Sequence, residues 1–413
     1  MCLSRHWFAG KEKIGENSIF SKPLKMPKLR PVKVIKLPRS KVHLGAPLAW
    51  SVRDEHGTLL LSKGFVVQTE AQLDQLLQRG AFVDVEEVIA SAQSEQAPDV
   101  KTVVLPPNLF GLWAKTAEGL RILMTRPEEK PDFAAQLDAF VVNILALLDS
   151  NVDIALYRAV RQDNHQHFYY GYTHAIHTAV LCVLLSRHLR WATARMLSLV
   201  KAALTMNLTI LELQGKMAAQ ETPVKDQQRA EIQAHPVKTV ALLNKLGIED
   251  DDWLRAVAQH HEQSDGTGYP SRCTAIDEMA IALRVCDVFM AKISPRALRA
   301  ALSPQEAIKQ LYREDKGGPL STAVVKVFGI YPPGDFVKLA SGELGIVVER
   351  TANARAPIVA SITDTTGHPV ARTVRHDTGQ AEFAITGTAS DQAMLKRLPP
   401  ERLYGFSMAP VPH

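Results

Sequence analysis

The sequence predicts a mainly α-helical protein: an all-helical bundle preceded by a small β+α module and followed by a short β extension. Three observations support this fold class. Between residues 108 and 326, apolar side chains recur at the three- and four-residue spacing of amphipathic helices, often enough for six or more helices. Short β-branched stretches separated by glycine-containing turns occur near both ends of the chain. Aromatic residues make up only 6% of the chain, which argues against an all-β sandwich.

The first part of the chain is strongly basic. Residues 1–45 hold eleven Lys or Arg but only Glu12 and Glu16 as acids, and residues 1–30 are expected to be a disordered basic tail. Such a tail could contact nucleic acid or an anionic membrane, although most tails of this kind are simply solvated. No aromatic stacking platform accompanies the charges, so no nucleic-acid partner is expected. Met26 is an alternative start of the chain.

Residues 31–88 are expected to form a small β-rich domain, and residues 89–107 a linker. A helix is expected over 69–77, because Thr69 can cap its start and Gly80 can end it. The expected strands are 32–37, 48–52, 59–61 and 65–67.

Residues 108–335 are expected to form the helical domain, and residues 336–413 a C-terminal β-rich extension. The expected helices are 112–124, 133–148, 170–188, 197–213, 231–246, 251–261, 279–291 and 304–312. The expected C-terminal strands are 336–339, 345–349 and 358–362, with a hairpin turn at 341–343 between the first two.

Composition limits the compartment and the class of protein. No run of about 18 apolar residues occurs, so no transmembrane segment is predicted, and no cleavable signal peptide fits the first residues. The four cysteines contain no Cys-x-x-Cys pair, which suits a reducing cytoplasm and excludes a disulfide framework. Phosphate-binding glycine loops and the Gly-x-Ser-x-Gly elbow of hydrolases are also absent from the sequence.

The most informative stretch is His260-His-Glu-Gln-Ser-Asp-Gly-Thr-Gly-Tyr-Pro270. It places two imidazoles and two carboxylates at the end of an expected helix, the kind of side chains that hold a metal for phosphate chemistry. Three further histidines, His174, His177 and His235, lie on or near other expected helices. Asp287 lies within an otherwise apolar helix and should therefore have a cationic or metal partner.

This stretch resembles the signature of the HD-GYP family, the all-helical phosphodiesterases of the bacterial second messenger cyclic di-GMP. The resemblance extends from near Asp149 to Leu339, and it includes His235-Pro236, the segment 286–291 and Gly329-Ile-Tyr-Pro-Pro-Gly334. The N-terminal module is similar to a small domain of unknown function that often precedes such domains. The resemblance implies an HD-type bundle and the metal ligands His174, His235, His260, His261 and Asp287.

Four positions depart from the family pattern. Met206 and Asn207 stand where the family has its His-Asp pair, whose aspartate bridges two metal ions. Ile210 replaces the family's lysine, and Met290 replaces the aspartate that pairs with it. Tyr170 stands where some members have a ligand glutamate. Methionine and asparagine suit iron or manganese poorly, so the site is expected to hold one or two such ions loosely, or none, and the catalytic residues are expected to be lost.

Other parts of the resemblance concern binding. Arg296 and Arg299 are expected to grip phosphates of cyclic di-GMP or a related nucleotide, with a solvated helix face as the alternative. The loop residues Asp265, Gly266, Gly268, Tyr269 and Pro270 are expected to dock a partner such as a diguanylate cyclase domain.

Three functions therefore stay open from the sequence. The first is a degenerate HD-GYP protein of cyclic di-GMP signalling with little or no phosphodiesterase activity, which acts by binding the nucleotide or a partner. The second is an active metal-dependent phosphodiesterase with an altered metal site, in which Asn207 is a neutral ligand. The third is a structural scaffold that binds nothing. The oligomeric state is not predicted.

Overall fold

The computed structural model describes residues 34–55, 59–61, 63–78, 80–85, 87, 108–162, 167–370, 373–389 and 399–404. The expected basic tail (1–30), with the alternative start at Met26, and the expected linker (89–107) lie outside these residues. By its internal contacts the chain divides into two units, Met1–Thr102 and Val103–His413, and each is described separately.

The first unit contains a four-stranded antiparallel sheet with a helix. The strand order is β1-β4-β2-β3. The elements are β1 (Val34–Lys36), β2 (Val52–Arg53), β3 (Leu59–Leu61), α1 (Glu70–Gln78) and β4 (Phe82–Asp84). β4 was not expected, and the strand expected at 65–67 is wrong, because Val66 forms only an isolated bridge to Pro47 beside a turn at Gly64.

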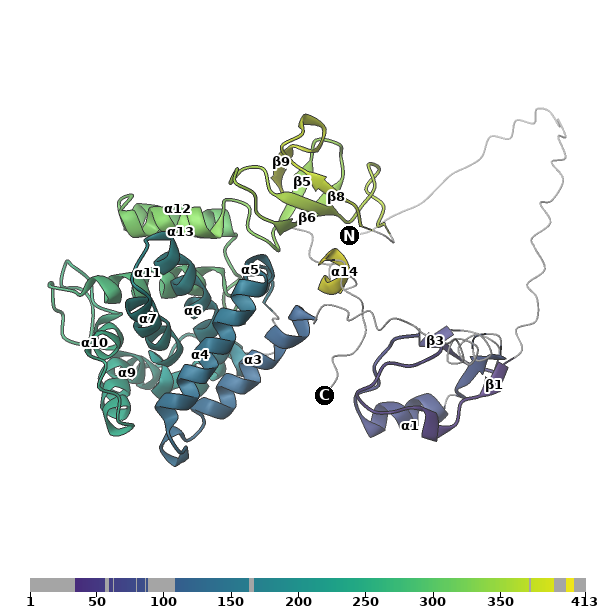
Figure 1. Ribbon diagram of the computed structural model, residues 1–413, viewed down its shortest axis with the longest axis horizontal. Helices are drawn as coiled ribbons and strands as arrows, with labels where there is room; N and C mark the ends of the chain where they lie inside the picture. The colour runs from purple at the N-terminus through teal and green to yellow at the C-terminus, as the bar shows by residue number, and fades with distance from the viewer. Residues whose placement is uncertain are drawn as a thin grey trace, which may run out of the picture. The chain divides into compact units, whose positions relative to one another are not determined.

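The second unit is a helical domain continuous with a C-terminal sheet (Figure 1). Its longer helices are α3 (Leu109–Met124), α4 (Phe133–Ser150), α5 (Val152–Val160), α6 (Tyr170–His188), α7 (Thr193–Thr205), α8 (Leu211–Ala219), α9 (Asp226–Lys245), α10 (Asp251–Gln259), α11 (Glu278–Ile293), α12 (Pro304–Glu314) and α13 (Pro319–Phe328). α6 is mostly apolar and has no exposed polar face; it is buried from Tyr170 to Ser186 except at Thr173, as expected for a central helix. The mainly α fold class is confirmed.

Two departures from the expected helices matter for the site. The helix expected over 197–213 is broken: α7 ends at Thr205, a 3-10 turn η4 follows (Leu208–Ile210), and α8 then begins. Helices α5 and α13 were not expected. α13 is short and rich in β-branched residues, which by sequence resemble a strand.

Two helical segments reach the length and hydropathy of a membrane span, although no such segment was predicted. They are Phe133–Ser150 and Thr193–Ala219, each with a mean hydropathy of 1.4. The apolar window of the second is 72% buried, and that of the first is 33% buried. Core helices of globular proteins pass the same test of length and composition, so this is weak evidence for a membrane location.

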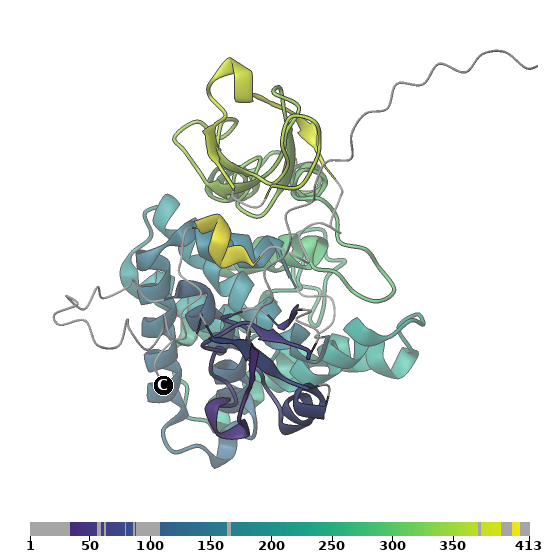
Figure 2. The same cartoon turned by 90° about the vertical axis from the view of Figure 1, so that its right-hand side faces the viewer.

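The C-terminal sheet is antiparallel, with the strand order β8-β7-β6-β5-β9, and it is strongly curled (Figure 2). Its strands are β5 (Phe336–Leu339), β6 (Leu344–Glu349), β7 (Ile358–Ser361), β8 (Arg375–Asp377) and β9 (Ile385–Thr388), and a short helix α14 (Pro400–Tyr404) follows. The three expected strands are confirmed to within one residue, whereas β8, β9 and α14 were not expected.

The register of this sheet explains how it joins the helices. Phe336, Ile346 and Ala360 lie opposite one another on adjacent strands, and all three belong to the main helical core. Their neighbours Val347 and Val359 point to the other face and form a second small core. The helices and one face of the sheet therefore share a single hydrophobic core.

Candidate metal centre

The bundle brings three of the expected ligand histidines together. His235 comes from α9, His260 and His261 follow directly on α10, and ligand nitrogens of all three lie within 4.8 Å of one another. His235 and His260 are fully buried. Three imidazole nitrogens converging at this distance suit a single transition-metal ion.

The hydrogen bonds of His235 and His260 fix which nitrogen of each ring faces the cluster. Nδ1 of His235 lies 2.5 Å from the carbonyl oxygen of Ile232, and Nδ1 of His260 lies 2.7 Å from that of Val257. A carbonyl oxygen only accepts, so each Nδ1 carries a proton. Burial, with the neighbouring His260, lowers the pKa of His235 to about 3, and burial also lowers the pKa of His260. Both rings are therefore neutral at pH 7, and each Nε2 is left with a bare lone pair.

These two lone pairs face each other, with His235 Nε2 only 3.2 Å from His260 Nε2. Neither nitrogen can donate to the other, so the contact is not a hydrogen bond in this protonation state. A cation placed between His235 Nε2, His260 Nε2 and the His261 ring would be bound by the lone pairs of all three imidazoles. The backbone carbonyls at Nδ1 would then hold the rings in the tautomer that metal ligands need. The donor set of the histidines thus fits a metal ion.

His261 completes the cluster from a less buried position. Its ring stacks on Tyr269, with the ring centroids 4.6 Å apart, and meets His235 edge-on at 5.1 Å. Burial and the neighbouring His260 hold the pKa of His261 well below its usual value. No proton therefore competes for this nitrogen at neutral pH.

Asp287 and His174 form a buried pair beside the cluster. Asp287 Oδ1 lies 2.7 Å from His174 Nε2, and both side chains are buried between α11 and α6. Burial would raise the pKa of Asp287, but the hydrogen bond and charge of His174, with His261 and His260, hold it below its usual value. Asp287 is thus a carboxylate at neutral pH, and its charge in turn opposes the lowering of the pKa values of the three clustered histidines.

Tyr170 covers His174 and connects it to one of the expected phosphate-binding arginines. The rings of Tyr170 and His174 stack at 5.6 Å and are nearly parallel. The guanidinium of Arg296 donates to the Tyr170 hydroxyl at 2.6 Å and lies 5.0 Å from the ring centroid. Arg299 is exposed; it pairs with Arg296 through two backbone hydrogen bonds and donates to the carbonyl of Ala291.

The positions that depart from the family pattern are all buried. Met206 and Met290 are fully buried and belong to the main core, Asn207 is 4% exposed, and Ile210 is 6% exposed. Asn207 is the residue at which the backbone leaves α7 and enters the 3-10 turn η4.

The expected docking loop is tightly built. Asp265 accepts hydrogen bonds from the backbone and hydroxyl of Thr267, and Gly266 has a φ of +74°. A Cβ on Gly268 would lie 2.4 Å from the backbone nitrogen of Gln263. Pro270 follows Tyr269 through a cis peptide bond. The Tyr269 ring is thus directed toward His261, and the exposed part of the loop is formed by Ser264, Asp265 and Thr267.

Sequence reasoning missed one residue that shapes this centre, Glu262, and one contact of a predicted loop residue, Tyr269. Glu262 is 1% exposed, and its carboxylate accepts from the backbone of Ser271, which ties the two ends of the loop together. The sequence shows that Glu262 follows the two histidines, but it does not show where the Glu262 side chain points. The stacking of Tyr269 on His261 depends on the same loop conformation and has no signal in the sequence.

Comparisons with known proteins relate the domain that carries these residues to a known family. Residues 155–317 match the family model described as HD domain. A cyclic di-GMP phosphodiesterase of Pseudomonas aeruginosa is 27% identical over 186 residues, which cover 44% of this chain and 45% of that protein. A 3'3'-cGAMP-specific phosphodiesterase of Vibrio cholerae is 29% identical over 138 residues, 33% of this chain and 30% of that protein. The matches thus span less than half the length of these relatives.

Among solved structures, an HDG"Y"P protein from Bdellovibrio bacteriovorus aligns with 71% of this chain and 98% of its own, at a TM-score of 0.45 and 14% identity. A likeness at that level carries no argument about function. The family match identifies residues 155–317 as an HD domain, and the histidine cluster and the Gly-Tyr-Pro loop both lie within that segment.

Proposed function

We propose that this chain acts in cyclic di-GMP signalling as a degenerate HD-GYP protein, which binds a cyclic dinucleotide or a partner and hydrolyses little or none. The observation that carries the proposal is the burial of Met206 and Asn207 where the family has its His-Asp pair. Ile210 and Met290 are buried as well, so both partners of a second charged pair are replaced by apolar side chains. Replacing both members avoids leaving one buried charge unpaired.

The remaining donors support one metal ion better than two. His235, His260 and His261 supply three neutral nitrogens, while the carboxylate beside them, Asp287, already pairs with His174. A bridging carboxylate would normally place two metals about 4 Å apart to activate a water for attack on phosphorus. Asn207 carries no charge for that role. The proposed ion, iron or manganese, would act as a Lewis acid that holds a phosphate oxygen.

The proposed ligand is cyclic di-GMP or a related cyclic dinucleotide. The relatives are named for activity on cyclic di-GMP and on 3'3'-cGAMP, and this chain shares their domain over its middle third. Arg299 is exposed, and within the described residues only one of its guanidinium N–H groups donates, to the carbonyl of Ala291, so the others suit a phosphate; Arg296 is partly engaged by Tyr170.

Titration calorimetry of cyclic di-GMP into the full-length, metal-loaded chain tests binding, and chromatography of the same mixture tests hydrolysis. We expect saturable binding, weakened at least tenfold in Arg299→Gln, and no turnover. Arg313→Gln removes an exposed arginine from α12 and should leave binding unchanged. Turnover on the order of 1 per second or faster would contradict the proposed loss of activity. A complete lack of binding would favour the scaffold alternative.

A second candidate is an active phosphodiesterase with an altered metal site. The facing lone pairs of His235 and His260 support it, because such an arrangement suits a bound metal ion. Metal analysis separates this candidate from the first. We expect about one tightly bound ion per chain, lost in His261→Gln. Two ions per chain together with hydrolysis would establish the active enzyme instead.

The loop after His261 is proposed to dock a protein partner such as a diguanylate cyclase domain. Its exposed residues Ser264, Asp265 and Thr267 provide the contact surface, because Tyr269 is turned toward His261. A pull-down of a purified cyclase domain by the wild type but not by Asp265→Lys would support this role. Equal capture by both would contradict it.

A further inference from the structure

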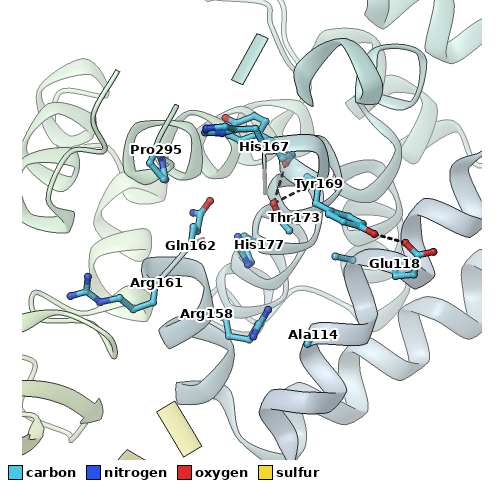
Figure 3. Close-up of a pocket in the computed structure, with 12 residues that line it drawn as sticks. Ala114, Glu118, Arg158, Arg161, Gln162, His167, Tyr169, Thr173, His177 and Pro295 are labelled. Carbon is cyan, nitrogen blue, oxygen red and sulfur yellow. Dashed lines mark hydrogen bonds between the residues drawn. The ribbon is translucent and has the colours of Figure 1, made fainter. Parts of the chain in front are cut away.

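A cavity of about 510 Å³ lies between α3, α5, α6 and the 3-10 turn η3 (His167–Tyr169). Figure 3 shows the side chains that line it, among them Arg158, His177, Tyr169 and Glu118. This volume is in the range of pockets that hold small organic molecules. None of the three clustered histidines lines the cavity.

Arg158 gives this cavity a positive charge that the described part of the chain does not pair. Its side chain is half-buried, and within the described residues it makes no hydrogen bond and no ion pair within 4.0 Å. Burial lowers the pKa of Arg158, and the charge of Glu401 on α14 opposes that effect only from a distance. A guanidinium held in a sheltered cavity without a hydrogen-bonded anion is costly.

The other charged groups of the cavity are already engaged. Glu118 accepts from Arg121 at 2.6 Å and from the Tyr169 hydroxyl at 2.9 Å, and these bonds lower its pKa to about 2. Arg161 donates to the carbonyl of Gly334 at 2.5 Å and lies 3.9 Å from the centroid of the Phe336 ring. In Figure 3 the Arg161 side chain accordingly points away from Arg158 and His177.

His177 adds a second unused group. It is 8% exposed, and its Nδ1 is buried without a hydrogen-bond partner in the described residues. Burial and the positive charge of Arg158 lower the pKa of His177 to about 3, so the ring stays neutral at pH 7. A neutral imidazole can donate one hydrogen bond to an anionic oxygen without adding to the desolvated positive charge.

The cavity and the metal centre share one wall but use different groups. Tyr170 lines the cavity and stacks on His174, whereas His177 lies one helical turn farther along α6. Arg158 comes from α5, which supplies none of the clustered histidines. A ligand could therefore occupy the cavity whether or not the metal centre is loaded.

We propose that this cavity is a second binding site, for a small organic anion whose phosphate or carboxylate group contacts Arg158 and His177. The planar guanidinium matches two oxygens of such a group, and the Tyr169 and Tyr170 rings flank the space left for the organic part of the ligand. The site is independent of the proposed binding of a cyclic dinucleotide at the metal centre.

The test is thermal unfolding and titration calorimetry of the full-length chain with three probes: inorganic phosphate, ribose 5-phosphate and succinate. If the ligand is a phosphate compound, ribose 5-phosphate is expected to bind saturably and to raise Tm. If the ligand is a carboxylate, succinate is expected to do so. Arg158→Gln should weaken binding at least tenfold. Arg126→Gln removes an arginine that is 76% exposed and should leave the affinity within twofold of the wild type.

Two more variants keep the test decisive. Ala117→Leu fills the cavity from α3 without a change of charge and should also abolish binding, which covers the case in which Arg158→Gln fails to fold. His261→Gln changes the metal centre and should bind the probe as the wild type does. Binding in the cavity can therefore be confirmed even if the function proposed for the metal centre is wrong. Equal binding by the wild type, Arg158→Gln and Ala117→Leu, or no saturation by any probe, would overturn the proposal.

Discussion

At the scale of single residues, protonation determines what the histidine cluster can do. His235 and His260 each donate the Nδ1 proton to a backbone carbonyl, so the two Nε2 atoms that face each other are both acceptors. The sequence predicts that these side chains are potential ligands. It cannot predict the tautomers, because they depend on which carbonyl lies within about 3 Å of each ring.

The residues at the degenerate positions allow a reversion experiment. Met206→His with Asn207→Asp places two polar groups in a site that is now almost completely buried, so the metal-free double variant should lose about 1 to 3 kcal/mol of unfolding free energy. Adding Ile210→Lys and Met290→Asp should restore the charged pair and raise the metal content toward two ions per chain. Denaturant melts and metal analysis check both steps.

Hydrolysis of cyclic di-GMP should appear only in the fourfold variant. Activity already present in the double variant would mean that the lysine–aspartate pair is dispensable. No second metal in the fourfold variant would mean that the surrounding backbone, including the turn at Leu208–Ile210, has diverged too far to rebuild the site.

His177 makes stability depend on pH. Its pKa is about 3 in the folded chain, because of burial and Arg158, against about 6.5 in the unfolded chain. As pH falls below 6.5, the unfolded chain takes up a proton that the folded chain does not, so stability falls. From pH 7 to pH 5 this one group should cost about 2 kcal/mol.

Urea melts at the two pH values measure this effect, with His177→Gln as the comparison. The wild type should lose about 2 kcal/mol more than the variant does on acidification, since glutamine does not titrate. Equal losses in both proteins would show that His177 is protonated in the folded state.

At the scale of elements, periodicity predicted helices well where a helix has a long uniform pattern. α6 has the expected bounds, and α4, α9 and α11 differ from expectation by no more than five residues at either end. The break between α7 and α8 was missed, because Met206 to Ile210 continue the apolar pattern while the backbone changes to a 3-10 turn. Short elements such as α5 and β4 depend on tertiary contacts more than on local sequence.

The loop after α10 shows the same division between pattern and geometry. Its composition predicted a tight turn beside a metal site. The structure adds the reason for glycine at position 268, where the turn leaves no room for a side chain. The Gly268→Ala Cβ would meet the Gln263 nitrogen at 2.4 Å, so the loop would have to move and withdraw Tyr269 from His261.

We expect Gly268→Ala to lower the unfolding free energy by about 1 to 3 kcal/mol and to weaken metal retention. Gly387→Ala is a matched control, because a Cβ at Gly387 meets nothing within 4 Å. Calorimetry and metal analysis of the two variants provide the comparison. A Gly268→Ala protein with the Tm and metal content of the control would show that the loop conformation does not support the centre.

At the scale of the whole molecule, the second unit is held together by the core that the helices share with the C-terminal sheet. Sequence patterns predicted the sheet as an extension, but its contribution to the helical core follows from the strand register. Asp153 at the start of α5 binds Arg350 at 2.5 Å, which adds a charged contact at the edge of that core.

Removing residues 336–413 should therefore destabilise the helical domain. Phe336, Ile346, Val348, Ala360 and Ile362 would be lost from its core, and their partners would be exposed to water. We expect an aggregating chain without a cooperative melt, whereas removal of residues 1–102 should leave the Tm of the second unit nearly unchanged. A shortened chain ending at residue 335 that melts cooperatively at the original Tm would contradict the shared core.

Helix α5 has contacts that give it a further consequence. Its first turn is tied to the sheet through Asp153, and Arg161, directly after its last residue, is tied to the chain just before and within β5 through Gly334 and Phe336. Arg158, between them, faces the cavity. If the anion binds as proposed, we expect occupancy of the cavity and attachment of the sheet to be linked through the nine residues of this helix. Linkage is reciprocal. A partner that binds the C-terminal strands would then change the affinity for the anion, and the anion would change the affinity for that partner by the same factor.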